Sequence, residues 1–359
     1  MPTISQGSKV LVSGANGYLA MWTVRILLER GYNVRGTVRD EGKTQFVREY
    51  FAKRGFGNDR LELVSVPDIV KEGAFDEFVK DVEGILHTAS PFHSNVKEPE
   101  GKLISLRKLI DQDSDIFPRR ILPSSRPGNG PNVKRIVVTS STAAVMEPPT
   151  QPTQFSELNW NESAPKEVEE KGSNAAPMTI YRASKALAEK SAWKFVEEHK
   201  SEVKWDLSVI NPPFIFGPPI HDIKSASALN TSLKLWYDTL TGEPAKTRDQ
   251  LKASFTWVDV RDTALAHILA LEKAEAGGER IITAAGPCLW QEWLEAANSL
   301  PQSQRPANLP VGYPDILEGE RTYLANWDLS KEARILGIKF HSKAETTKDT
   351  IENFKERGW

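Results

Sequence analysis

A tyrosine and a lysine four residues apart, Tyr181 and Lys185, are the side chains of this 359-residue sequence best suited to acid–base chemistry. Residues at this spacing lie on one face of a helix. Ala192 and Phe195 continue the same face, so we expect it to be buried. A phenol normally has a pKa near ~10, and an adjacent ammonium in a partly dry cleft stabilises its ionised form. The pair is therefore suited to proton transfer with a substrate oxygen, although a pair at this spacing can also arise by chance.

A run of four hydroxyl residues, 139–142, follows an apolar stretch that begins at Arg135. In an open α/β sheet the C-terminal ends of the strands line the ligand crevice. A hydroxyl there, above all that of Ser141, can bond a substrate carbonyl and direct it toward Tyr181. The alternative is ordinary turn chemistry, because Ser and Thr are frequent where a strand ends.

A glycine-containing turn at residues 14–20 follows the apolar run 9–13 and opens an amphipathic stretch that stops at Gly31. Glycines permit a tight turn and let backbone N–H groups approach a pyrophosphate, to which the helix N-terminus adds partial positive charge. The same pattern can instead serve helix packing alone. On the binding interpretation, the expected dinucleotide contacts are Gly14, Asn16, Gly17, Tyr18 and Leu19.

The end of the second apolar run indicates which dinucleotide is bound. An NAD-binding protein usually has an acidic residue there, whereas this chain has Arg39 followed by Lys43. A guanidinium forms bidentate, charge-assisted bonds with phosphate, so the pattern favours the 2′-phosphate of NADP. The alternative is that Arg39 is a surface charge and Asp40 binds the ribose.

The elements that must position these residues alternate between strands and helices. Short apolar runs at 9–13, 33–38, 61–66, 84–88, 135–140 and 207–211 are separated mostly by helical stretches. This order predicts an α/β, Rossmann-type, doubly wound parallel sheet. We expect residues 1–211 to form the NAD(P)-binding domain. Residues 212–359 should form mainly a smaller C-terminal substrate-binding lobe, with helices near 225–240, 258–273 and 291–300 and some segments returning to the first domain.

Two stretches interrupt the pattern. Residues 101–131 occupy the place of a crossover helix but carry four prolines in a basic, Ser-rich segment, so only their first part can be helical. Residues 147–177 are Pro-rich and acidic, and we expect a long loop that covers the active site or is disordered.

Composition excludes several classes of function. Lys and Arg total 46 against 48 Asp and Glu, so no net charge attracts nucleic acid or an anionic membrane. The apolar runs are much shorter than a membrane-spanning helix, and the first residues lack the apolar core of a secretory signal. A single cysteine, Cys288, excludes an intrachain disulfide and a Cys-rich zinc site, and the six His lack HExxH spacing. These features predict a soluble, cytoplasmic protein with no metal site.

In combination, these motifs resemble the extended short-chain dehydrogenase/reductase superfamily. Within it they are most similar to the NADPH-dependent branch of dihydroflavonol reductases, cinnamoyl-CoA reductases and fungal aldehyde, ketone and methylglyoxal reductases. The resemblance covers most of residues 8–290. Its motifs are residues 14–20, 37–39, 67–69, 87–91, 139–141, 181–185, 211–218 and 257–262.

The resemblance implies a role for each motif. Tyr181 would act as general acid, Lys185 would stabilise its phenolate and hold the nicotinamide ribose, and Ser141 would orient the carbonyl, with hydride from NADP(H). His87 is better interpreted as a hydrogen-bonded residue at a strand end than as a catalytic group. Further cofactor contacts implied are Asp68 and Ile69 beside the adenine, Ala89, Ser90 and Thr139 along the cofactor, and Pro212, Pro213 and Phe214 at the nicotinamide.

Departures from the family narrow the expected substrate. Met146 stands where flavonoid reductases carry a polar residue, and residues 176–180 lack the Asn-Trp-Tyr-Cys element of cinnamoyl-CoA reductases. A flavonoid and a CoA thioester are therefore disfavoured, which leaves a small to medium, largely apolar carbonyl compound. We expect an apolar pocket, although each residue could instead belong to the core; its members would be Phe92, Met146, Ile180, Phe214 and Phe216.

Two alternative functions stay open. A nucleotide-sugar epimerase or sterol dehydrogenase would use the same Tyr181 and Lys185. A non-catalytic NADP-binding sensor or interaction protein would bind cofactor without turnover. Residues 101–131 replace a family helix that often helps to form a dimer, so we expect a monomer or a weak homodimer, and the segment itself is either an authentic insertion or an error of splicing or reading frame.

Overall fold

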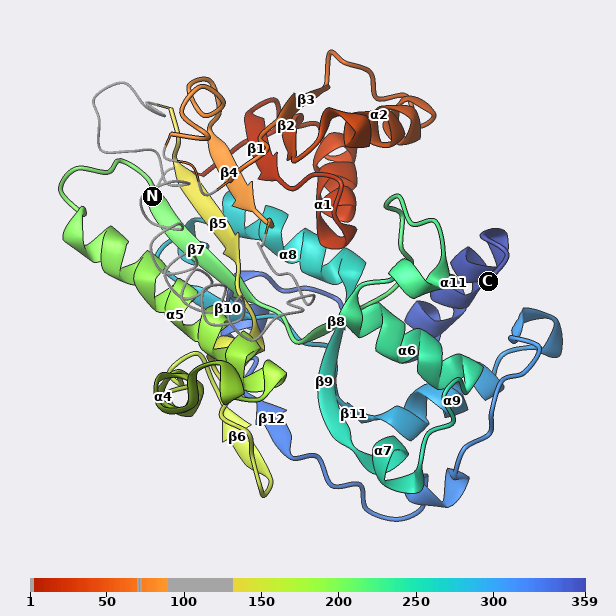
Figure 1. Ribbon diagram of the computed structural model, residues 1–359. Helices are drawn as coiled ribbons and strands as arrows, with labels where there is room; N and C mark the ends of the chain where they lie inside the picture. The colour runs from red at the N-terminus through yellow and green to blue at the C-terminus, as the bar shows by residue number, and fades with distance from the viewer. Residues whose placement is uncertain (1–2, 70, 72, 90–131) are drawn as a thin grey trace.

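The computed structural model describes residues 3–69, 71, 73–89 and 132–359 (Figure 1). Its centre is a seven-stranded sheet of order β10-β7-β5-β4-β1-β2-β3, in which every neighbouring pair is parallel. The strands are β1 (Lys9–Ser13), β2 (Asn33–Val38), β3 (Leu61–Ser65), β4 (Gly84–His87), β5 (Arg135–Thr139), β7 (Asp206–Asn211) and β10 (Arg280–Ile282). The strand order reverses between β1 and β4, as in a Rossmann fold, and the predicted fold class is confirmed.

Helices cover both faces of this sheet, as Figure 1 shows. Val10 and Val12 of β1 belong to a core shared with α1 (Tyr18–Glu29) and α8 (Val260–Glu272). Leu11, between them, belongs to a second core shared with α5 (Pro177–Glu198). Successive side chains of a strand point to opposite faces, so an apolar run buried on both sides requires a helical layer on each.

The C-terminal lobe is built on a three-stranded sheet of order β11-β9-β8. Its core is aromatic: Phe216 packs edge-on against Phe255 and Trp293, and Trp236 packs edge-on against Trp293. The elements of the lobe are β8 (Phe214–Phe216), α6 (Thr231–Thr241), α7 (Arg248–Lys252), β9 (Ser254–Asp259), β11 (Gly286–Leu289), α9 (Trp290–Asn298) and α11 (Lys343–Glu356).

Two segments beyond residue 211 return to the first domain. β10 forms an edge of the seven-stranded sheet, with Ile281 opposite Ile210. The helix expected in the lobe near 258–273 is α8, which packs against α1 and β5. The placement of this helix in the lobe was therefore wrong. Its apolar side chains, among them Ala264 and Ile268, are fully buried, which suits a helix between a sheet and another helix.

The loop predicted for residues 147–177 is also wrong. This segment contains β6 (Thr153–Phe155), which pairs with β12 (Ala325–Trp327), and the helix α4 (Ser163–Lys171). Pro165 is compatible with the helix because it lies in the first turn, where no backbone N–H is required. Ala164 and Val168 are buried in a cluster with Ala183 of α5. Residues 101–131 lie outside the described part of the chain.

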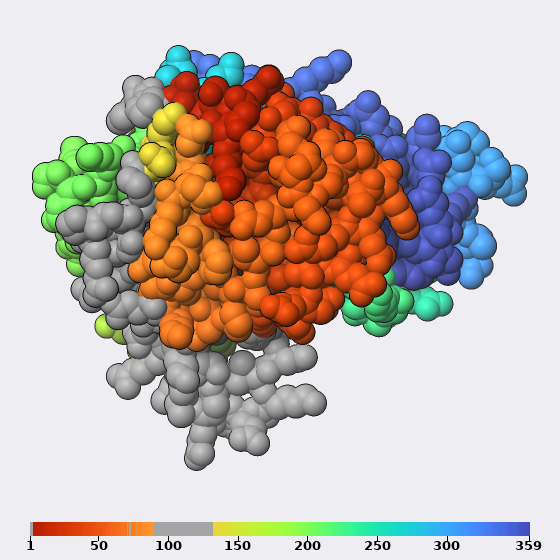
Figure 2. Space-filling view, turned by 90° about the horizontal axis from the view of Figure 1, so that it is seen from above, coloured from red at the N-terminus to blue at the C-terminus, as the bar shows by residue number. Residues whose placement is uncertain are grey.

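The N-terminal segment forms one continuous area of the molecular surface, with the C-terminal residues beside it (Figure 2). Tyr50 of α2 (Thr44–Ala52) and the C-terminal residues Phe354 and Trp359 belong to the same large hydrophobic core. Within the described ranges, none of the helices combines the length and the apolar character needed to cross a membrane.

Candidate active site

The glycine turn lies where the strand order reverses, between the ends of β1 and β4. Gly14 has φ +66°, and a Cβ built on it would lie 3.2 Å from the Cβ of Ala89. Only glycine fits this conformation and this close approach. Gly17 caps α1 and has no side chain that could accept from the first turn of the helix. The N–H groups of that turn, including those of Tyr18 and Leu19, are therefore available to a phosphate.

The end of β2 fixes the shape of this turn. The Thr37 carbonyl accepts from the N–H of Ala15 at 2.8 Å, and the Thr37 hydroxyl accepts from the N–H of Gly14 at 3.3 Å. A Cβ on Gly36 would lie 2.6 Å from that of Ala15, so β2 passes too close for a side chain. The predicted residues Gly14, Asn16 and Gly17 therefore form one compact cradle.

The side chain of Tyr18 does not face this cradle. Its hydroxyl donates to the Gly217 carbonyl at 2.8 Å, and Trp22 Nε1 donates to the Pro218 carbonyl at 2.8 Å. Burial raises the pKa of the Tyr18 phenol, and the nearby Asp259 carboxylate raises it further. The predicted cofactor contact of Tyr18 is thus limited to its backbone, while its ring joins α1 to the first residues of the lobe.

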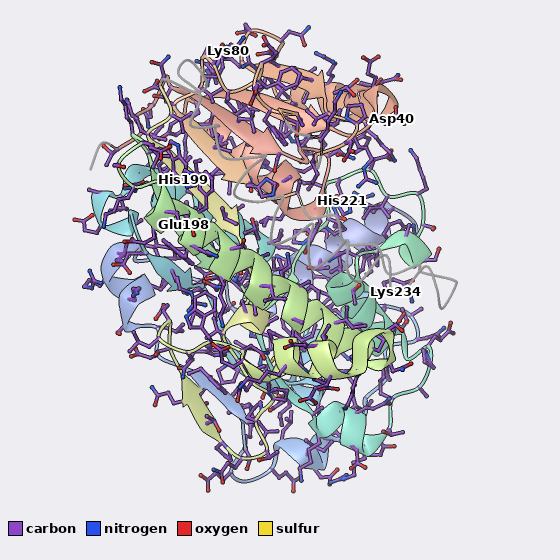
Figure 3. All side chains as sticks on the ribbon, turned by 60° about the vertical axis from the view of Figure 1, so that its left-hand side comes forward. Asp40, Lys80, Glu198, His199, His221 and Lys234 are labelled. Carbon is purple, nitrogen blue, oxygen red and sulfur yellow. The ribbon has the colours of Figure 1, made fainter. Side chains whose placement is uncertain are left out.

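Basic side chains project from the end of β2. Arg39 and Lys43 are exposed. The Asp40 carboxylate accepts from the N–H of Gly42 at 2.9 Å and caps the short helix η1 (Glu41–Lys43). Figure 3 shows Asp40 at the periphery of the molecule. One oxygen of Asp40 is thus engaged within its own turn, beside the exposed guanidinium of Arg39. After the adjacent strand β3, Asp68 is exposed and its neighbour Ile69 is partly buried.

The end of β4 is held by Ser13. Its hydroxyl oxygen accepts from the N–H groups of Thr88 and Ala89, both at 3.0 Å, so its proton is directed to Nδ1 of His87 at 2.8 Å. Burial, together with the nearby charge of Lys185, lowers the pKa of His87 to about 3. His87 is therefore a neutral, hydrogen-bonded residue, as expected, and Lys185 lies near enough to the end of β4 for its charge to act on the imidazole.

Tyr181 and Lys185 lie in the first turns of α5, which begins with Pro177 as its first residue. Both side chains are partly buried, and further along the helix Ala192 and Phe195 are buried, as the spacing predicted. In Figure 3, α5 crosses the molecule and ends near its labelled residues Glu198 and His199. The proposed reactive pair is therefore at the opposite end of the helix.

Ser141 follows β5 and is almost completely buried, with 8 % of its surface exposed. Its Oγ accepts from the N–H of Ala143 at 3.1 Å and lies 3.4 Å from the Pro212 carbonyl. The second distance is long for a hydroxyl donor, so little is lost if the proton turns to another acceptor. The short helix that follows, η3 (Thr142–Ala144), contacts α5, which brings Ser141 to the helix of Tyr181.

Of the residues expected at the nicotinamide, Pro213 is partly exposed and Pro212 is buried beside Ser141. The residues expected in the pocket divide into two groups, of which the first, Met146 and Phe214, is partly exposed. Phe216 has no exposed surface, and Ile180 packs toward the Ala164 and Val168 cluster. The alternative that these residues belong to the core fits Phe216, and Ile180 is directed toward the α4 cluster. Ser90 and Phe92 lie outside the described residues.

The buried carboxylate of Glu189 was not predicted from the sequence. Glu189 of α5 is 3 % exposed and accepts from Ser140 and Asn211, at the ends of β5 and β7. Its position four residues after Lys185, on a face already expected to be buried, was the available signal.

The sequence matches the NAD dependent epimerase/dehydratase family over residues 10–285. The chain belongs to this family. It is 33 % identical to the ketoreductase azaE of Aspergillus niger, over 98 % of this chain and 99 % of that protein. It is 35 % identical to the putative NADPH-dependent methylglyoxal reductase GRP2 of Candida albicans, over 97 % and 98 %. Its fold is similar to that of the yeast methylglyoxal/isovaleraldehyde reductase Gre2 complexed with NADPH, with TM-score 0.82, 32 % identity and coverage of 97 % and 99 %.

Proposed function

We propose that this protein is an NADPH-dependent reductase that converts an aldehyde or ketone to an alcohol. The observation that carries the proposal is the position of Lys185. Its charge acts on His87 at the end of β4, and Ala89, two residues later, touches the glycine turn. We infer that the Tyr181 helix and the dinucleotide cradle face one crevice near the end of β4.

The residues present fit NADPH. The turn at Gly14 has no room for side chains, and the N–H groups of the first turn of α1 suit a pyrophosphate. Arg39 and Lys43 stand at the end of β2, where the 2′-phosphate of the adenosine would lie. We assign further contacts to Asp68, Ile69, Ala89, Thr139 and the 212–214 segment. When bound, the reduced cofactor supplies a hydride.

Three side chains would act on the substrate carbonyl. Ser141 donates its loosely held proton to the carbonyl oxygen and fixes the orientation of the substrate. Tyr181 donates the proton that completes the alcohol. Lys185 stabilises the tyrosinate that remains and binds the ribose hydroxyls, because its ammonium lies on the same face of α5.

The substrate we propose is a small to medium carbonyl compound bound beside Met146 and Phe214. Both side chains are apolar and partly exposed, and aromatic and aliphatic surfaces usually line such sites. The names of the relatives, ketoreductase and methylglyoxal reductase, agree with this class of substrate.

Location and assembly complete the proposal. We place the protein in the cytoplasm, since its one cysteine, Cys288, is a buried free thiol. We expect a monomer or a weak homodimer, which sedimentation analysis at two concentrations distinguishes.

The test is NADPH oxidation by the purified protein, followed by absorbance with a panel of α-dicarbonyls, aromatic aldehydes and β-keto esters. We expect turnover that Tyr181→Phe lowers at least ~100-fold, the low end for loss of a general acid. Tyr313→Phe, at a tyrosine 39 % exposed in the lobe, is the matched control. NADPH binding by calorimetry without turnover on any carbonyl would favour the non-catalytic alternative instead.

A further inference from the structure

Glu189 joins the helix of the proposed reactive pair to three strands of the sheet. Each of its carboxylate oxygens has two donors. Oε1 accepts from Arg280 Nε at 2.5 Å and, more weakly, from Trp193 Nε1 at 3.5 Å. Oε2 accepts from the Ser140 hydroxyl at 2.6 Å and from Asn211 Nδ2 at 2.8 Å. A single buried charge thus ties α5 to the end of β5, the end of β7 and the start of β10.

The first consequence concerns Ser141, the direct neighbour of Ser140. The backbone at Ser141 is extended, with φ −163° and ψ 155°, so the two serine side chains point to opposite sides. Holding Ser140 on Glu189 therefore sets the direction in which Ser141 points. The Asn211 amide adds a second restraint, because the same Nδ2 atom donates to the Ser141 carbonyl at 3.2 Å.

The second consequence concerns α5. Glu189 lies one helical turn after Lys185 and about two turns after Tyr181, on the same face. An ion pair with Arg280 and bonds to two strand ends fix both the rotation of the helix and its position along the sheet. These are the two variables that set where the Tyr181 hydroxyl stands relative to Ser141.

Arg280 extends the network to the segment that precedes α4. Its Nη1 donates to the carbonyls of Glu157 at 2.8 Å and Asn159 at 3.0 Å. Asn161, two residues after Asn159, donates from Nδ2 to the Met146 carbonyl at 2.8 Å. The partner of Glu189 therefore also holds the segment that positions Met146.

The chemistry of the network requires a carboxylate. All four partners of Glu189 donate, and an ionised carboxylate accepts at every lone pair. A glutamine has the same shape but would direct its NH2 group against other donors. Leaving a buried polar group without a hydrogen-bond partner destabilises the protein much more than losing a weak hydrogen bond at the surface.

We propose that Glu189 is a positioning residue that aligns Ser141 with Tyr181 and Lys185 for carbonyl reduction. This inference rests on the proposed function. It assigns to Glu189 no contact with substrate or cofactor, so the cofactor cradle at Gly14 should not depend on it.

The test compares Glu189→Gln with a matched buried pair. Arg135 and Asp206 form a bidentate ion pair at 2.6 and 2.8 Å, with side chains 0 % and 8 % exposed. They are the first residues of β5 and β7, so the pair joins the same strands at their opposite ends. Asp206→Asn thus breaks an equally buried pair far along the strands from Ser141.

We expect Glu189→Gln to lower kcat about 10- to 100-fold, as a small misplacement of reacting groups does, with a much smaller change in the Kd for NADPH because the cradle at Gly14 lies outside α5. Asp206→Asn should lower the melting temperature but leave kcat, measured well below that temperature, within about threefold. Equal losses of kcat in both variants, or an unchanged kcat in Glu189→Gln, would overturn the inference. If Glu189→Gln does not fold, Glu189→Asp, which keeps the charge but withdraws it by one methylene, replaces it in the same comparison.

A double variant separates alignment from general instability. If Glu189 acts through Tyr181, Glu189→Gln should cost much less in the Tyr181→Phe background than in wild type. An equal factor in both backgrounds contradicts alignment. A wild-type protein without carbonyl-dependent NADPH oxidation would contradict the proposed function instead. The inference is then decided by crystal structures of wild type and Glu189→Gln, and it fails if Ser141 has the same position in both.

Discussion

The hydroxyl of Thr139 donates a hydrogen bond to Nε2 of the buried His267, 2.7 Å away. The direction is fixed because Nδ1 of His267 lies 2.7 Å from the Thr263 carbonyl, which can only accept, so the ring proton is on Nδ1. Burial lowers the pKa of His267 to about 4, so the ring stays neutral. Thr139 therefore offers its oxygen to the crevice only as an acceptor, for example for a cofactor hydroxyl.

Thr139→Val should therefore reduce the free energy of unfolding by about 1–3 kcal/mol, because Nε2 of His267 stays buried without a donor. Chemical denaturation measures the loss. Thr139→Ser keeps the hydroxyl and should recover most of it. If valine and serine destabilise the protein equally, the effect belongs to the lost methyl packing and not to this bond.

Replacing Arg39 should weaken the preference for NADPH over NADH. A hydrogen bond to a charged group contributes about 1.5–3 kcal/mol, so Arg39→Ala should reduce the ratio of kcat/KM values for the two cofactors roughly 10- to 100-fold. Lys53→Ala, at an exposed lysine just after α2, is the control and should leave the ratio unchanged. If the ratio of kcat/KM values is unchanged in Arg39→Ala, then Asp40 or Lys43, and not Arg39, recognises the ribose.

The Tyr18 hydroxyl should matter for stability but not for cofactor affinity. Tyr18→Phe removes the donor to the buried Gly217 carbonyl, which predicts a loss of about 1–2 kcal/mol in unfolding free energy. The Kd for NADPH, measured by fluorescence titration, should stay within twofold because only the backbone of Tyr18 faces the cradle. Greatly weakened binding would show that the phenol contacts the cofactor.

The pair of His341 and Asp262 predicts a dependence of stability on pH. Nδ1 of His341 lies 2.6 Å from the nearly buried Asp262 carboxylate, and this bond raises the pKa of the imidazole above its ordinary ~6.5. The carboxylate of Asp259 raises the pKa further, and Arg261 opposes the increase. Because the folded protein favours the charged ring, the stabilisation is complete below pH ~6.5 and is lost as pH rises through the higher pKa of the folded state.

His341→Asn keeps a donor near Asp262 but cannot take up charge. We expect the melting temperature of wild type to exceed that of His341→Asn most at pH 5.5–6, and the difference to shrink toward pH 9. A difference that is constant across this range would mean that the charge of His341 contributes nothing.

Much of the first domain was predictable because its elements are local in sequence. The runs that became β1 and β2 were predicted with their observed bounds. In β1 the signal was the apolar run at residues 10–12, which is typical of a parallel strand buried on both faces. The glycine turn was predictable because Gly14 requires a backbone conformation that other residues rarely adopt.

The remaining features depend on contacts between distant residues. A glutamate on a helix normally faces water, and nothing near Glu189 in sequence announces Arg280, which lies 91 residues away. β10 is only three residues long and begins with that arginine, so no apolar run marks it. α4 was missed because its proline suggested a loop, although a proline in the first turn costs a helix nothing.

The path of the chain between sheet and lobe also limits how the protein can be divided into separate fragments. The chain enters the lobe after β7, returns at α8 to pack on the sheet, adds β10 to the edge of the sheet and then enters the lobe again. A protease that nicks any one of these connections would leave two fragments still interlocked through the others. Exchange of lobes between related reductases therefore cannot use a single junction: a working chimera needs matched breakpoints on both sides of α8 and β10.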